Sequence, residues 1–253
     1  MTTTTPTAPL EAEPSSGRRI GPMSPMRKVA LAGGIAYLVS FAASIPQLKL
    51  FAGLIDDPSG FISGTGSDTA VLWGSWLEVI TAASCIATAV ALYPATRRIS
   101  RTAAIGFVTT RVVEATLIMV GVLSILSVVT LKANFAGATG NEAAALQVTG
   151  ETLVAMRQWT FLLGPGLIVG FNALFLGYVM YRGRLVPRII PTLGLIGAPL
   201  ILMSATATIF GLWDQVSTPS ALCTLPVAVW EFSLGVYLTF KGFKKFPDDI
   251  APV

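Results

Sequence analysis

The chain has 253 residues, of which 53% are hydrophobic and only 12% are charged, and its formal net charge is +4. An ordinary soluble domain carries about twice that share of charged residues, so the composition excludes one. The basic residues flank apolar runs and form no patch, which argues against a nucleic-acid partner. The chain has no histidine, which excludes histidine-based zinc chemistry and Ser-His-Asp triads.

The N-terminal segment, residues 1–26, is rich in Thr, Pro, Ser and Gly and poor in large apolar side chains. It cannot bury enough apolar surface to offset its ordering entropy, so we expect a disordered cytoplasmic tail. A signal peptide is not expected, because no small-residue cleavage site follows the first apolar run. A short second cytoplasmic tail is expected at 246–253.

Between the tails, residues 27–245 contain six apolar runs of about 20 residues, the length that crosses a ~30 Å hydrocarbon core. The sequence therefore predicts an all-α polytopic membrane protein, a six-transmembrane-helix bundle. Its predicted partner is the lipid bilayer that surrounds it. The predicted spans are 29–46, 69–93, 103–130, 159–181, 189–213 and 219–240.

The charged residues between the spans predict an orientation. Basic residues gather on one side, at positions 18, 19, 27, 28, 97, 98, 101, 182, 184, 188, 241, 244 and 245. The opposite side has only Lys49, Lys132 and Arg157. The positive-inside rule then puts both termini in the cytoplasm and leaves 47–68 and 131–158 as external connections. Within the second connection, the segment from Asn141 predicts a short helix lying on the outer interface.

Ionisable side chains inside a membrane are unfavourable, so they usually face a protein interior or a cavity and are candidates for function. The predicted spans contain four of them, Glu78, Arg111, Glu114 and Glu231, and the polar Asn172. Arg111 and Glu114 are three positions apart, so they share one helix face. We expect Glu78, Glu114 and Glu231 to converge on one polar pocket near the midplane, bordered by Asn172.

Three carboxylates and one guanidinium sum to −2 when all are ionised, which hydrocarbon does not tolerate without protons, a cation or water. One interpretation is a proton relay or a binding site for a small solute. The other is a packing role, in which Arg111 holds helices together and the remaining acids are protonated. The residues leave both interpretations open.

The remaining features of the sequence are a proline and glycines in the fourth span and the absence of known catalytic motifs. Pro165 should distort the fourth span, and Gly166 and Gly170 allow close helix approach. No Gly-rich phosphate loop, GxSxG elbow or paired-cysteine metal spacing is present, so we expect no catalytic residues, no metal and no cofactor.

Five blocks of the sequence resemble the bacterial membrane family catalogued as domain of unknown function 4386, over about residues 27–245. The blocks are Thr109–Ala115, Trp159–Gly166, Leu176–Arg188, Phe210–Gln215 and Trp230–Gly235. The resemblance implies the cytoplasmic (inner) membrane of a bacterium and no assigned activity.

The leading functional hypothesis is a carrier of a small solute or of protons that uses the midplane charges. The alternative is an accessory or interaction protein in which the same charges only pack helices. A third hypothesis, an intramembrane lipid-modifying enzyme, is disfavoured by the missing catalytic motifs. A water-filled route to the carboxylates would favour the carrier.

Overall fold

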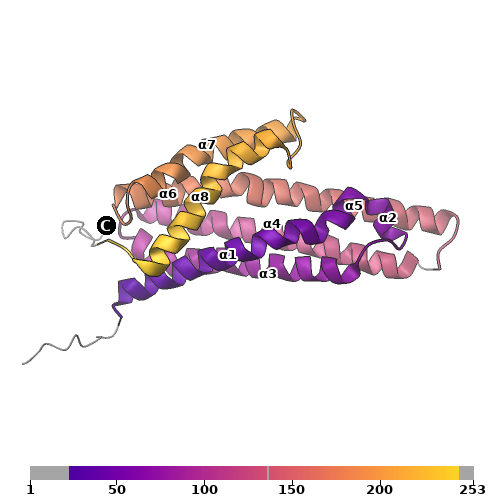
Figure 1. Ribbon diagram of the computed structural model, residues 1–253, viewed down its shortest axis with the longest axis horizontal. Helices are drawn as coiled ribbons and strands as arrows, with labels where there is room; N and C mark the ends of the chain where they lie inside the picture. Colours follow the sequence, from indigo (N-terminus) through magenta and orange to yellow (C-terminus); the bar gives the residue numbers. More distant parts are fainter. Residues whose placement is uncertain (1–22, 136, 245–253) are drawn as a thin grey trace, which may run out of the picture.

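The computed structural model describes residues 23–135 and 137–244. The predicted tails lie almost entirely outside these residues. The described residues contain no strand, and six helical segments are long and apolar enough to cross a membrane (Figure 1). The prediction of an all-α integral membrane protein is confirmed.

The described residues form nine helical elements, eight of which make up these six segments, while the short α2 lies between the first two. The nine elements are α1 Pro25–Asp56, α2 Pro58–Ile62, α3 Asp68–Thr96, α4 Arg101–Phe135, α5 Asn141–Phe161, the π-helix η1 Leu162–Ile168, α6 Val169–Arg182, α7 Ile189–Ile209 and α8 Thr218–Phe240. The chain runs from α5 through η1 into α6 without a break, so these three elements form the fourth span.

We call the end of the molecule where α1 begins and α8 ends the terminal end, and the end that carries α2 the distal end (Figure 1). The described basic residues at positions 27, 28, 97, 98, 101, 182, 184, 188, 241 and 244 lie at helix ends and connections of the terminal end. At this end Arg27 of α1 donates hydrogen bonds to the carbonyl oxygens of Leu238, at 2.8 Å, and Thr239, at 2.6 Å. These are carbonyls that the end of a helix leaves unpaired, so α1 caps α8.

The first span continues ten residues beyond the predicted boundary at Pro46, and the predicted loop at 47–68 is mostly helix. A proline removes one helical hydrogen bond but does not prevent the chain from resuming the helix. The resumed segment is stabilised by packing, because Phe51 and Leu54 are buried in a distal core with Phe61 of α2 and Val154 of α5.

The fourth span also differs from its prediction. The segment from Asn141 forms no separate helix on the interface, because α5 continues through η1 into the membrane. The expected distortion at Pro165 takes the form of the π-helix, a wider turn in which the missing proline N–H is tolerated.

Candidate functional site

Arg111 of α4 is the centre of a buried polar cluster, and its guanidinium is held by three other helices. Nη1 donates to Glu114 Oε2 at 3.0 Å and lies 3.5 Å from Cys85 Sγ of α3. Nη2 donates to the hydroxyl of Tyr37 on α1, at 2.9 Å, and to Glu231 Oε1 on α8. The guanidinium also lies 5.0 Å from the ring centre of Tyr37, within the range of a cation–π contact.

Asn172 brings a fifth helix into this cluster. Its Nδ2 donates to Glu114 Oε2 at 2.5 Å, so one carboxylate oxygen accepts from both Arg111 and Asn172. Asn172 is 1% exposed, and its Oδ1 has no hydrogen-bond partner among the described residues. We call Tyr37, Cys85, Arg111, Glu114, Asn172 and Glu231 the Arg111 cluster.

The local sequence explains this convergence. Arg111 and Glu114 are neighbours on one helical turn, so their pairing needs no long-range contact. Helix α8 approaches α1 closely at glycines: a Cβ placed on Gly34 would lie 2.5 Å from Thr239 Oγ1. That approach brings the Glu231 face of α8 beside Tyr37.

Within the cluster, two carboxylates share one guanidinium. With all three groups ionised, the sum is one negative charge. The Arg111 side chain is 3% exposed and that of Glu114 is 6% exposed, whereas that of Glu231 is 21% exposed. Glu231 is therefore the member of the cluster that is most open to its surroundings.

Glu78 lies outside this cluster and has its own partner. Glu78 Oε1 accepts from Nη2 of Arg157 on α5, and both side chains are at most 5% exposed. The Arg157 guanidinium also lies 4.8 Å from the ring centre of Phe161. Glu78 precedes Cys85 by two turns of α3, so this pair lies about 10 Å from the Arg111 cluster, toward the distal end.

The structure therefore brings together four of the five residues that the sequence singled out, namely Arg111, Glu114, Asn172 and Glu231. The expectation that Glu78 converges with Glu114 and Glu231 is wrong, because Glu78 is bonded to Arg157. The expectation for Arg157 is wrong as well. The sequence predicts an external charge that flanks a span, but the residue is buried and only 4% exposed. With this second guanidinium, the sum over the buried charges is −1, where the sequence analysis counted −2.

Two contacts of Arg111 went unrecognised in the sequence. Tyr37 stands in an apolar run with no ionisable neighbour at helical spacing, and Cys85 looks like a small apolar residue. Glu114 and Glu231 both face the Arg111 guanidinium, and among the described residues no three His, Cys, Asp or Glu side chains are grouped so that they could hold a metal ion.

Comparison with known proteins gives one match. The model of the family described as "Domain of unknown function (DUF4386)" matches residues 32–242, a range that contains every residue of the Arg111 cluster as well as Glu78 and Arg157. No curated protein matches the chain, and no solved structure does.

Proposed function

We propose a function from the chemistry of the site, because the chain belongs to the DUF4386 family, whose description assigns none. The proposal is a proton-linked carrier of a small solute, in which the Arg111 cluster takes up and releases the proton. Arg111, Glu114, Glu231 and Asn172 would act together. Glu78 and Arg157 would form a second ion pair, which holds α3 against α5 and takes no part in proton exchange.

The observation that carries this proposal is the sharing of one guanidinium by two carboxylates. A pair of one carboxylate and one guanidinium is neutral as a whole, so it does not require a proton to balance its charge. A cluster with one carboxylate in excess does, because an uncompensated negative charge inside a membrane is strongly unfavourable. One proton, or one cation, restores neutrality.

Glu231 is the carboxylate through which we propose that the proton enters and leaves the cluster, because its side chain is more exposed than those of Arg111 and Glu114. A neutral Glu231 attracts Arg111 less than an ionised one does. Protonation therefore weakens a contact that holds α8 against α4. A helix whose position depends on a bound proton is the kind of two-state element that a carrier requires.

We also propose that the terminal end faces the cytoplasm in a bacterial inner membrane. The asymmetry of basic residues supports this orientation more strongly once Arg157 is removed from the external set. Apart from the buried Arg111 and Arg157, Lys49 and Lys132 are then the described basic residues that lie away from the terminal end.

The experiment uses proteoliposomes with an entrapped fluorescent pH dye. Amino acids, sugars and carboxylic acids are added outside as separate sets. The wild-type protein should move protons in response to at least one set. Glu231→Gln, which keeps the size of the side chain and removes its carboxylate, should abolish that response.

Glu151→Gln is the matched control, because Glu151 is an exposed carboxylate on α5 that contacts Gln147. It should behave as the wild type. The proposal fails if wild-type vesicles show no solute-dependent proton movement, or if Glu231→Gln and wild type respond equally. A silent wild type together with a large loss of thermal stability in Glu231→Gln would favour the accessory protein.

A further inference from the structure

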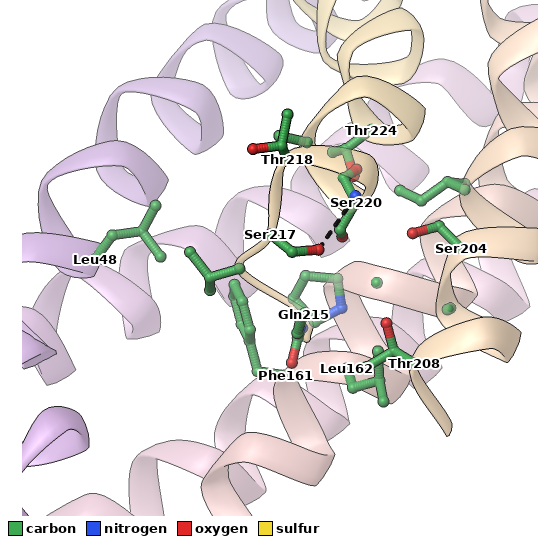
Figure 2. Close-up of a pocket in the computed structure, with 16 residues that line it drawn as sticks. Leu48, Phe161, Leu162, Ser204, Thr208, Gln215, Ser217, Thr218, Ser220 and Thr224 are labelled. Carbon is green, nitrogen blue, oxygen red and sulfur yellow. Dashed lines mark hydrogen bonds between the residues drawn. The ribbon is translucent and has the colours of Figure 1, made fainter. Parts of the chain in front are cut away.

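A second candidate site lies away from the Arg111 cluster, between η1, α7 and the start of α8. Figure 1 shows α7 and α8 diverging from the other helices toward their connecting loop. A pocket of about 420 Å³ occupies this region, within the usual size range of small-molecule sites. Leu48, on the part of α1 that continues beyond Pro46, closes one side of it (Figure 2).

The pocket contains polar side chains that have no partner. The hydroxyls of Ser204, Thr208 and Ser220 and the side-chain amide of Gln215 make no hydrogen bond to another described residue. Ser204 is 2% exposed and Ser220 is 8% exposed, so these hydroxyls are nearly removed from solvent. Figure 2 shows these four side chains around one space. Buried polar groups normally have a hydrogen-bond partner, so this set is suited to a ligand that supplies one.

The remaining walls define the chemistry of that ligand. No charged residue lines the pocket, and most of its surface is apolar, from residues such as Phe161, Leu162 and Ile201. A charged ligand would be left without a counter-charge among these residues. A ligand with an apolar skeleton and a hydroxyl group suits both kinds of wall, because the skeleton packs against the apolar residues and the hydroxyl can donate to one of the unpaired groups and accept from another.

The rim indicates the kind of ligand that the pocket admits. Leu48 on α1 is 53% exposed, Val216 in the connection between α7 and α8 is 88% exposed, and both line the pocket. Apolar side chains at the rim favour a ligand with a long apolar chain, such as a bilayer lipid has, over a small water-soluble one. We propose that this pocket binds an uncharged, single-chain lipid-like alcohol taken from the membrane. The site is independent of the carrier function proposed above.

The test uses three photoreactive probes of equal chain length that carry the same diazirine: a long-chain alcohol, the corresponding carboxylic acid and the corresponding alkane. Each is added to the full-length protein in vesicles, and the labelled peptides are identified by mass spectrometry. The alcohol should label the segments 161–166, 204–208 and 215–224 several-fold more than the alkane or the acid does. Unlabelled long-chain alcohol should compete, whereas a short-chain, water-soluble alcohol at equal concentration should not.

Two variants test the assignment of the polar groups. Ser204→Ala with Thr208→Val nearly preserves volume and should reduce the preference for the alcohol over the alkane about two- to tenfold, the range expected for a lost hydrogen bond. Gly166→Leu should abolish labelling by filling the pocket. A Cβ at this position meets nothing closer than 3.5 Å, so the side chain can leave the backbone without a clash, and thermal unfolding of the variant checks that it folds. Thr192→Val, at the opposite end of α7, is the control and should leave labelling unchanged.

Each other outcome overturns the proposal. Equal labelling by alcohol and alkane would mean that the pocket is only a lipid-filled gap. Preference for the acid would contradict an uncharged ligand, and competition by the short-chain alcohol would place the source in water. Loss of solute-dependent proton movement has no bearing on this assay, so failure of the carrier proposal and failure of this one are separable.

Discussion

Two buried arginines, Arg111 and Arg157, are neutralised in different ways. Arg111 contacts two carboxylates, a phenol and a thiol from four helices. Arg157 has one carboxylate partner, Glu78, and otherwise lies against the rings of Phe51 and Phe161. In the second arrangement each charged side chain has a single charged partner, so the contribution of the pair to stability can be measured by removing one or both partners.

Arg157→Leu should lower the free energy of unfolding by about 3–5 kcal/mol, because it leaves Glu78 as an unpaired buried charge. The double change Arg157→Leu with Glu78→Leu should recover most of that loss, since no uncompensated charge then remains. The measurement is reversible unfolding in mild detergent, with a double-mutant cycle over the four proteins.

Asp68→Asn serves as the reference for this cycle. Asp68 pairs with Lys132 at 2.7 Å, but its side chain is 48% exposed, so the change should cost about 1 kcal/mol or less. If the double Leu variant is as unstable as Arg157→Leu alone, the loss of stability does not come from an unpaired Glu78, and the prediction is wrong.

The contrast also shows what the sequence could reveal at this scale. The contact between Arg111 and Glu114 follows from their spacing on one helix, and it was predicted. The contacts of Glu231 with Arg111 and of Glu78 with Arg157 depend on how whole helices rotate and approach, which no local pattern determines. Arg157 was misassigned because it lies at the margin of an apolar run, where a charge usually marks the membrane surface.

Helices α1 and α8 lie so close that the approach depends on glycine. A Cβ on Gly34 would lie 2.6 Å from the backbone nitrogen of Thr239 and 2.9 Å from the carbonyl oxygen of Gly235. These are backbone atoms and cannot move aside as a flexible side chain would. By contrast, a Cβ on Gly53, further along the same helix, would meet nothing within 4 Å.

Gly34→Ala should therefore destabilise the protein by about 1–3 kcal/mol, the usual range for overpacking. Gly53→Ala should be neutral or stabilising by up to about 1 kcal/mol, because alanine favours the helix. Thermal unfolding of both purified variants checks the pair. An equal response of the two would show that the α1–α8 contact is looser than described.

At the element scale, apolar length predicted the existence and order of the six spans, and α8 matches its predicted range closely. The extension of α1 past Pro46 was missed because a proline normally ends a helix. Its stabilisation comes from Phe51 and Leu54 in a core with α2 and α5, which are distant in sequence. The pocket could not be predicted for the same reason, since its walls come from four of the six spans.

Over the whole molecule, exposed tryptophans and the basic terminal end bracket a layer of membrane thickness. Trp76 and Trp159 are 56% and 52% exposed. Trp76 precedes Arg97 by about 32 Å of helix, and Trp159 precedes Arg182 by about 35 Å. These lengths fit a hydrocarbon core of ~30 Å with tryptophan at one interface and arginine at the other.

Reporter fusions test the orientation of this layer. Fusions after residues 99 and 186 should report the cytoplasm, because they follow or lie within basic connections. Fusions near 62, 140 and 216 should report the outside. The readout is a pair of reporters, one active only in the cytoplasm and one only beyond the membrane. A cytoplasmic signal from residue 140 would invert the orientation.

The pairing of Arg111 with Glu114 on a single turn has a consequence for biosynthesis. Membrane helices leave the ribosome in order, and a span that carries a lone charge is hard to insert. Helix α4 brings its arginine together with a carboxylate, so the pair enters the bilayer without net charge. Glu231 arrives 120 residues after Arg111, on the last span, and meets a guanidinium that is already in place. Helix α8 thus completes the cluster, and a chain that has not yet added α8 leaves the Glu231 contact of Arg111 open.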